Sequence, residues 1–321
     1  MMNTIPLIFN ERKVKCAVFG GNERPPVVQM NAAVVLLNEN TAHYRTGQLA
    51  DLLKMGFSEI ISVECAADNY SIEDISRRFP SVKFVIPLEP VTAGEMINIG
   101  ISETAAPYAL VVKGALRFSS GMLTPLIMQR LQQHDCLCVV PRLLDSEKNP
   151  LPVRYMPTVN KTVFKVQPVL KIYEGCWTLY PFDGIGLYNR RRFIELGGFD
   201  YTLTTAYWQL LDFAMRGWLW GERIIFSSLY QFVYEADVPI ENTTADMSQL
   251  RFFLKNIAPK LREDHAYIPF MRFFNYNRQA SCGIGEAYRQ FADARQWTEK
   301  NQYRFHFDAV KLINAWEYEK T

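Results

Sequence analysis

The sequence predicts an α/β fold: a mostly parallel central sheet with helices on both faces, followed by a helical C-terminal extension. Between residues 32 and 112, short apolar runs alternate with amphipathic segments, the pattern of a parallel sheet wrapped by helices. The chain has 321 residues, 49% of them hydrophobic, which is enough to build a full core. After residue 236, apolar residues recur at helical spacing. We therefore expect an N-terminal extension (1–31), a main domain (32–235) and a C-terminal extension (236–321).

The first half of the main domain is the most regular part. Strands are expected at 32–37, 59–63, 83–86 and 108–112, and helices at 44–55, 72–79 and 94–104. The strand runs are apolar throughout, as expected of strands buried on both faces. In such sheets ligands bind at the carboxyl ends of the strands, so the polar residues that follow each strand are candidate ligand contacts.

The flanking segments are less regular. Residues 15–19 read as a strand ended by Gly20 and Gly21, belonging either to a flanking hairpin or to an oligomer contact. Residues 189–193 begin a short helix that stops at Gly197-Gly198, and a second helical pattern begins at Leu211 and closes at Gly217. Within 236–321, helical patterns open at Asn242 and cover 288–297 and 304–318.

Composition excludes several classes of protein. The net charge of +2 is too small to indicate a nucleic-acid-binding protein. No apolar run approaches the roughly 18 residues of a membrane span, and the N-terminus lacks the basic-then-apolar order of a signal peptide. We expect a cytoplasmic protein, with peripheral membrane attachment left open. The six cysteines lack zinc-site spacing and are expected to be buried thiols.

The segment from 181 to 223 carries the most informative motifs. A small-residue turn at 183–186 is followed by an arginine run, by Gly197-Gly198-Phe199-Asp200, and by a helix that holds Asp212 and Arg216. This order resembles the acceptor half of family 2 glycosyltransferases of the GT-A fold, and the resemblance covers about residues 32–235. It implies transfer of a sugar from a UDP- or GDP-linked donor to a glycan or cell-surface acceptor.

The resemblance also implies site residues. Those for the nucleotide sugar follow the strand ends and the Gly94-x-x-x-Asn98-x-Gly100 segment: Asn38, Glu39, Glu64, Asp68, Asn98, Lys113 and Arg117. Those for the acceptor lie in the turn and around the altered acidic motif: Asp183, Tyr207, Trp208 and Gln209. The carboxylates left for catalysis are Asp212 and Asp200.

Two departures from the family pattern affect the chemistry. The Asp-x-Asp that would hold a divalent metal reads Lys113-Gly114-Ala115, and the Glu-Asp pair reads Gln209-Leu210. A diphosphate leaving group needs a positive charge beside it, and an inverting transfer needs a carboxylate to take the acceptor proton. Lys113 and Leu210 supply neither metal ligand nor base.

Three interpretations follow. In the first interpretation, the protein is an enzyme that works without a metal cofactor, and Lys113 and Arg117 neutralise the diphosphate. Alternatively, the chain is an inactive binding subunit, or the partner of an active transferase or of a second copy. In the third interpretation the motif register is shifted, and the ligands lie at residues such as Asp183 or Asp237.

Overall fold

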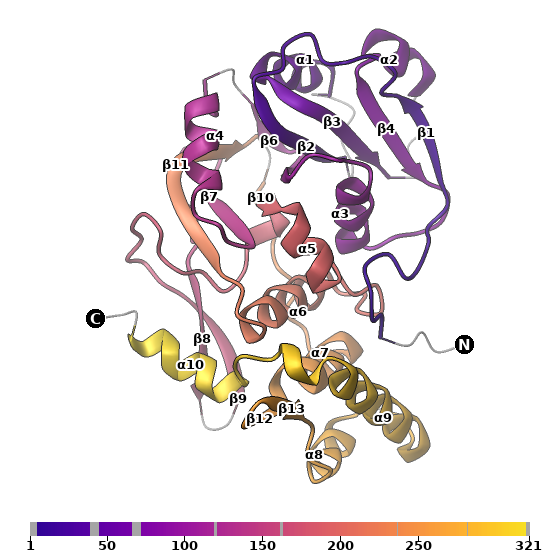
Figure 1. Cartoon of the computed structure of the whole chain (residues 1–321), viewed down its shortest axis with the longest axis vertical. Coiled ribbons are helices and arrows are strands. Elements are labelled where there is room, and N and C mark those ends of the chain that lie inside the picture. Colours follow the sequence, from indigo (N-terminus) through magenta and orange to yellow (C-terminus); the bar gives the residue numbers. More distant parts are fainter. Residues whose placement is uncertain are drawn as a thin grey trace.

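The computed structural model describes residues 5–38, 45–65, 72–118, 121–160, 163–235, 237–280 and 282–318 (Figure 1). Its central sheet is built from β1 (Cys16–Gly20), β2 (Met30–Asn38), β3 (Phe57–Glu64), β4 (Val82–Pro87), β5 (Tyr108–Lys113), β6 (Leu116–Arg117), β7 (Cys138–Leu144), β10 (Gly186–Asn189) and β11 (Ile224–Tyr234). Within the described residues, the strand order is β1-β4-β3-β2-β5-β10-β7-β11-β6.

Most of the sheet is parallel, as predicted. Neighbours β4, β3, β2 and β5 pair in parallel, and so do β7 and β11. Strand β10 lies antiparallel between β5 and β7, and β1 and β6 are antiparallel edge strands. The interior of β2, residues 32–37, is completely buried, because its apolar side chains project alternately into both covered faces.

The helices of the first half of the main domain begin and end close to the predicted positions. The described helices are α1 (Arg45–Met55), α2 (Ile72–Arg78), α3 (Ala93–Ser102), α4 (Pro125–Gln132), α5 (Arg190–Leu196), α6 (Ala206–Leu219), α7 (Met247–Phe252), α8 (Arg272–Gln279), α9 (Ile284–Lys300) and α10 (Ala309–Tyr318). Helices α4 and α8 were not predicted, and α10 begins at Ala309 instead of 304. Helix α5 ends at Gly197, whose φ of 94° is the left-handed conformation that favours glycine.

Helix α6 differs from its prediction, because it begins at Ala206 and continues through Gly217. A side chain at Gly217 would lie 2.8 Å from Leu137 Cδ2. Close packing against the sheet therefore explains this glycine, rather than a helix end. Helix α7 starts after the N-cap Asp246 and not at Asn242.

The N-terminal and C-terminal segments both join the main domain. Strand β1 extends the sheet beside β4, in the register Cys16 to Pro87. The C-terminal segment also contains a two-stranded hairpin, β12 (Lys260–Arg262) and β13 (His265–Tyr267), and a π-helical turn, Phe253–Ile257. A second hairpin, β8 (Tyr155–Asn160) and β9 (Val163–Pro168), stands outside the sheet. Within the described part of the chain, no helix has the length and apolar character to cross a membrane.

Candidate active site

A cavity of about 270 Å³ opens at the carboxyl ends of β2 and β5, where a parallel sheet is expected to bind its ligand. Its walls come from these strand ends, the start of α3, the 182–184 turn, the first turns of α6 and the segment 239–242. The lining residues are Leu37, Ala93, Gly94, Ile97, Lys113, Phe182, Asp183, Gly184, Phe199, Ala206, Tyr207, Gln209, Leu210, Pro239, Ile240, Glu241 and Asn242.

Lys113 and Asp183 form an ion pair in the cavity wall. The Lys113 ammonium lies 2.8 Å from the Asp183 carboxylate, and both side chains are largely buried. The Tyr234 hydroxyl donates to the other Asp183 oxygen at 3.0 Å. Asp183 has a φ of 55°, a conformation that aspartate tolerates better than most residues. The turn thus holds a carboxylate against the lysine at the end of β5.

Glu241 is the second carboxylate of the cavity. The Tyr180 hydroxyl donates a 2.7 Å hydrogen bond to it. Burial raises the pKa of Glu241 to about 6; the hydrogen bond from Tyr180 acts in the opposite direction, and the nearby charge of Asp183 adds to the increase. A carboxylate with a pKa close to neutral is suited to taking and returning a proton.

Gln209 and Leu210 occupy the cavity side of α6. The Gln209 carbonyl oxygen accepts from Gly94 N–H at 3.0 Å, and its amide donates to Thr92 Oγ1 at 2.8 Å and to the Asp200 backbone oxygen at 3.0 Å. A side chain at Gly94 would lie 2.6 Å from Gln209. Gln209 therefore fixes α6 to the start of α3, while Leu210 presents an apolar side chain to the cavity.

Asp200 and Asp212 lie elsewhere, in a buried charge cluster. The Lys255 ammonium donates to Asp200 at 2.7 Å and to Asp212 at 2.8 Å. Arg216 donates to Asp212 at 3.3 Å, as its i,i+4 position predicted, and Asn256 donates to the other Asp212 oxygen at 2.7 Å.

Burial alone would raise the pKa of Asp200, but the Lys255 charge and the Thr202 hydrogen bonds leave it below its usual value. Neither Asp200 nor Asp212 lines the cavity, and both are completely enclosed. A base must reach the acceptor hydroxyl. This placement argues against the predicted catalytic role of either carboxylate.

Asn98 and Arg117 also have structural partners. Asn98 accepts from the Phe199 N–H and donates to the Phe199 carbonyl, both at 2.8 Å, so it clamps α3 to the Gly-Gly-Phe loop. Arg117 pairs with Glu235 at 3.0 Å across β6 and β11 and is largely exposed. Neither side chain lines the cavity, which argues against the predicted nucleotide contacts.

Three further predicted residues, Asn38, Glu64 and Trp208, do not line the cavity. Asn38 donates to Glu64 at 2.8 Å, so the ends of β2 and β3 do meet. Trp208 donates to the Thr244 carbonyl at 2.9 Å and packs on Phe252, away from the cavity. Glu39 and Asp68 lie outside the described residues.

The Lys113 ammonium disfavours a divalent cation beside it at the end of β5. Lys113 occupies the end of β5, and its ammonium forms an ion pair with the Asp183 carboxylate. In the ranges that the structure describes, no three His, Cys, Asp or Glu side chains lie close enough together to hold a metal ion.

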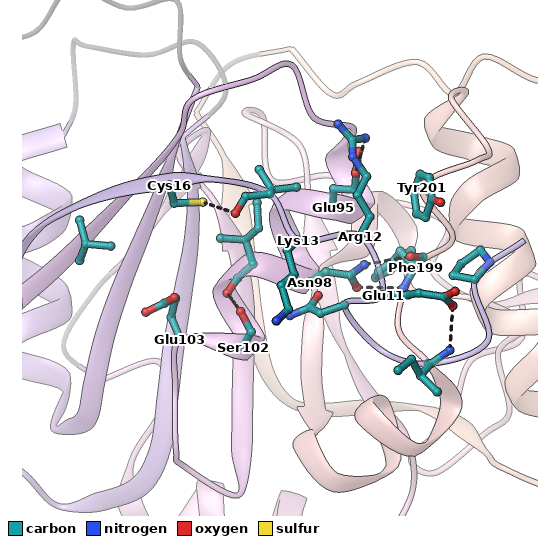
Figure 2. Close-up of a pocket in the computed structure, with 17 residues that line it drawn as sticks. Glu11, Arg12, Lys13, Cys16, Glu95, Asn98, Ser102, Glu103, Phe199 and Tyr201 are labelled. Carbon is teal, nitrogen blue, oxygen red and sulfur yellow. Dashed lines mark hydrogen bonds and ion pairs between the residues drawn. The ribbon is translucent and has the colours of Figure 1, made fainter. Parts of the chain in front are cut away.

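A second cavity, about 390 Å³, separates the N-terminal segment from α3 (Figure 2). Arg12 crosses its wall to Glu95 at 2.9 Å and to Glu89 at 3.1 Å. Phe199 lines both cavities. Ligands of parallel sheets bind at the carboxyl ends of the strands, so we place the candidate active site in the first cavity and not in this one.

Sequence reasoning missed Glu241, Tyr180 and Lys255. Glu241 follows the sheet in a segment without periodicity, and Lys255 lies in a helical pattern in which a lysine reads as exposed. The available signal for Lys255 was Asp212, whose place among the apolar residues of its helix called for a charged partner.

The comparisons with known proteins find the fold but no sequence relative. No protein-family model matches the chain, and no curated protein matches it. A crystal structure of GalNAc-T7 with UDP, GalNAc and Mn2+ matches with a TM-score of 0.62 and 11% identity, over 91% of this chain and 57% of that chain.

S. aureus TarS 1–349 in complex with UDP-GlcNAc matches with a TM-score of 0.50 and 14% identity, over 83% of this chain and 71% of that chain. This chain spans little more than half of the GalNAc-T7 chain, at 57% of its length. At such identities the likeness shows the fold alone: the chain has the GT-A-type α/β fold of these glycosyltransferases.

Proposed function

We propose that this protein is a glycosyltransferase of family 2 type with altered acidic motifs. It binds a UDP- or GDP-linked sugar at the ends of β2 and β5 and transfers the sugar to a glycan acceptor. The observation that carries the proposal is the cavity at this position of a GT-A-type fold, lined by a cation, Lys113, and by a carboxylate, Glu241.

Lys113 is proposed to neutralise the diphosphate, without a divalent metal. Its ammonium stands at the carboxyl end of β5 and is fixed there by Asp183. A fixed positive charge in a partly enclosed site stabilises charge that develops on a leaving group. The ion pair with Asp183 also means that a bound diphosphate competes with this carboxylate for the lysine.

Glu241 is proposed as the base in place of Leu210, since both line the same cavity. Its carboxylate takes the proton of the acceptor hydroxyl, and the hydroxyl oxygen forms the bond to the anomeric carbon. The bond from that carbon to the diphosphate breaks, and the nucleoside diphosphate leaves with the electron pair. Tyr180, which donates to Glu241, positions the carboxylate.

The alternative is an inactive nucleotide-sugar or glycan-binding subunit, alone, as a homo-oligomer or beside an active transferase. Leu210 favours it, because an apolar side chain in the cavity cannot take a proton, and the nearest carboxylate along α6, Asp212, is enclosed. Here the cavity would bind the same ligand and the chemistry would be missing.

Calorimetric titration with UDP and GDP, with and without Mn2+, tests the proposal. We expect binding that is independent of the metal, weakened at least tenfold by Lys113→Ala and unchanged by Lys311→Ala, an exposed lysine on α10. Absence of binding under every condition would refute the nucleotide-sugar function. Binding only with Mn2+ would refute the role of Lys113.

Donor turnover separates the enzyme from the inactive subunit. Release of UDP or GDP from a panel of nucleotide sugars is expected for the unaltered protein, and Glu241→Gln should lower it at least a hundredfold while leaving nucleotide binding intact. Binding without turnover of any donor would favour the inactive subunit.

A further inference from the structure

The hairpin of α8 and α9 exposes a cluster of apolar side chains. We call Phe270, Met271, Phe274, Ile284 and Tyr288 the α8–α9 tip; their exposed fractions lie between 49% and 72%. Figure 1 shows α8 at the opposite end of the long axis from α1 and α2. Folded monomers seldom expose contiguous apolar patches of this kind without a binding role.

The tip is contiguous around one buried ring, Phe273. The rings of Phe270, Phe274 and Tyr288 each lie about 6 Å from it, with centroid distances of 6.0, 5.9 and 5.9 Å. Met271 precedes α8 beside Phe270, and Ile284 lies one helical turn before Tyr288 on α9. Residues from both helices therefore contribute to one surface.

The hairpin does not need these exposed side chains for its own packing. Its inner face is closed by Phe273 against Phe291, at 5.4 Å, and by the hydrogen bond from the Tyr276 hydroxyl to Gln290. These inner side chains are buried. The exposed rings remain in water, where apolar surface is unfavourable. Covering them with a lipid phase or with another molecule would therefore lower the free energy.

The segment that carries the tip has a net positive charge. Between residues 268 and 290 the chain carries Arg272, Arg278 and Arg289 against a single acid, Glu286. Arg289 pairs with Glu286 at 3.1 Å, so Arg272 and Arg278 supply the excess charge. Arg278 follows Met271 and Phe274 by seven and four residues on α8, which places the three on one helical face. Aromatic and apolar side chains bordered by arginines are the composition of segments that lie in the headgroup region of a membrane.

We propose that the α8–α9 tip binds the surface of an anionic lipid membrane. The rings and Met271 enter the headgroup region, and the arginines pair with lipid phosphates. A symmetric contact with a second copy is less favourable, since it places the same arginines against each other. Because the patch is small, binding should be reversible and should weaken as salt rises.

Sedimentation with vesicles tests this inference. We expect the full-length protein to sediment with vesicles of 70% phosphatidylcholine and 30% phosphatidylglycerol, and to bind pure phosphatidylcholine at least tenfold more weakly. The double variant Phe270→Ser/Phe274→Ser and the variant Arg278→Glu should each lose at least 80% of the bound fraction.

Matched controls separate the tip from general effects. Leu170→Ser removes an apolar side chain that is 95% exposed outside the tip, and Arg130→Glu reverses an exposed charge on α4; both should bind like the unaltered protein. Circular dichroism checks that every variant is folded. The proposal is overturned if anionic vesicles are not bound, or if the tip variants bind as well as the controls.

A concentration-dependent dimer that the Phe270→Ser/Phe274→Ser change removes, without vesicle binding, would assign the tip to a second copy instead. The vesicle assay needs no nucleotide and no sugar, so it is independent of the proposed glycosyl transfer.

Discussion

At the residue scale, Asp183 controls how much positive charge Lys113 offers to a ligand. The two groups lie 2.8 Å apart and are largely shielded from water, so their attraction is stronger than that of a surface pair. A phosphate that approaches Lys113 also meets the negative charge of Asp183. The side chain that holds the lysine in place therefore opposes anion binding.

We predict that Asp183→Asn tightens UDP or GDP binding about five- to tenfold, equivalent to about 1–1.4 kcal/mol. Asparagine tolerates the positive φ at this position and still accepts from Tyr234, so the change removes the charge and little else. Calorimetry of the variant beside Lys113→Ala measures the effect. Weaker binding by Asp183→Asn would mean that the carboxylate itself contacts the ligand.

Glu241 should make stability depend on pH. Its pKa in the folded protein is about 6, above the ordinary value for glutamate, because burial disfavours the charged form. Its favourable contribution is therefore complete below the unfolded pKa of about 4.3 and is lost as pH rises through about 6.

We predict that Glu241→Gln, which keeps a partner for Tyr180, is more stable than the unaltered protein at pH 8 by about 1–2 kcal/mol. The difference should shrink toward pH 4.5. Urea unfolding of both proteins at the two pH values measures it. An equal difference at both would show that ionisation of Glu241 does not affect folding.

At the element scale, Asn98 joins α3 to the loop after α5. Its amide bonds both the N–H and the carbonyl of Phe199, and the φ of 65° at Gly198 brings that backbone to it. A side chain at Gly198 would lie 2.5 Å from Asn98 Oδ1. The Gly94–Gly100 segment and the Gly197–Asp200 segment recognised in the sequence thus meet at this contact.

We predict that Asn98→Ala lowers the free energy of unfolding by about 2–4 kcal/mol, because it leaves two backbone groups without their partner in a buried position. Ser102→Ala, at the end of the same helix, is the control and should cost less than about 1 kcal/mol. Urea unfolding compares the two. Equal effects would mean that water replaces the amide.

At the scale of the whole molecule, the C-terminal segment is built into the core of the main domain. Lys255 is the cation between Asp200 and Asp212. Trp316 on α10 packs 4.5 Å from Trp218 on α6, and Asp293 on α9 accepts from the N–H of Ile5. Residues of the C-terminal segment therefore stabilise both the α6 region of the main domain and the N-terminal segment.

We predict that Lys255→Met destabilises the protein by about 3–5 kcal/mol, because it removes the ammonium that two enclosed carboxylates share. Asp212 would keep its contact with Arg216, whereas Asp200 would lose its cation. Lys311→Met, on an exposed face, should change stability by less than about 0.5 kcal/mol. Unfolding followed by far-ultraviolet and near-ultraviolet circular dichroism should give one coincident transition. Two separated transitions would mean that residues 236–321 unfold as an independent unit.

Hydrophobic period and glycine chemistry are local properties, so the α/β class, the strands from 32 to 112 and the helix end at Gly197 could be predicted from the sequence. Strand ends and turns can also be read along the chain, and four of the predicted site residues, Lys113, Asp183, Tyr207 and Gln209, line the candidate cavity.

The partners of the charged side chains were decided only by the tertiary structure. Whether an aspartate faces a ligand or a buried lysine depends on segments distant in sequence, as with Asp200 and Lys255, 55 residues apart. The same holds for Glu241, whose environment is formed by Tyr180 and Asp183. Burial and pairing are properties of the assembled core, so a carboxylate's role could be inferred only once its surroundings were known.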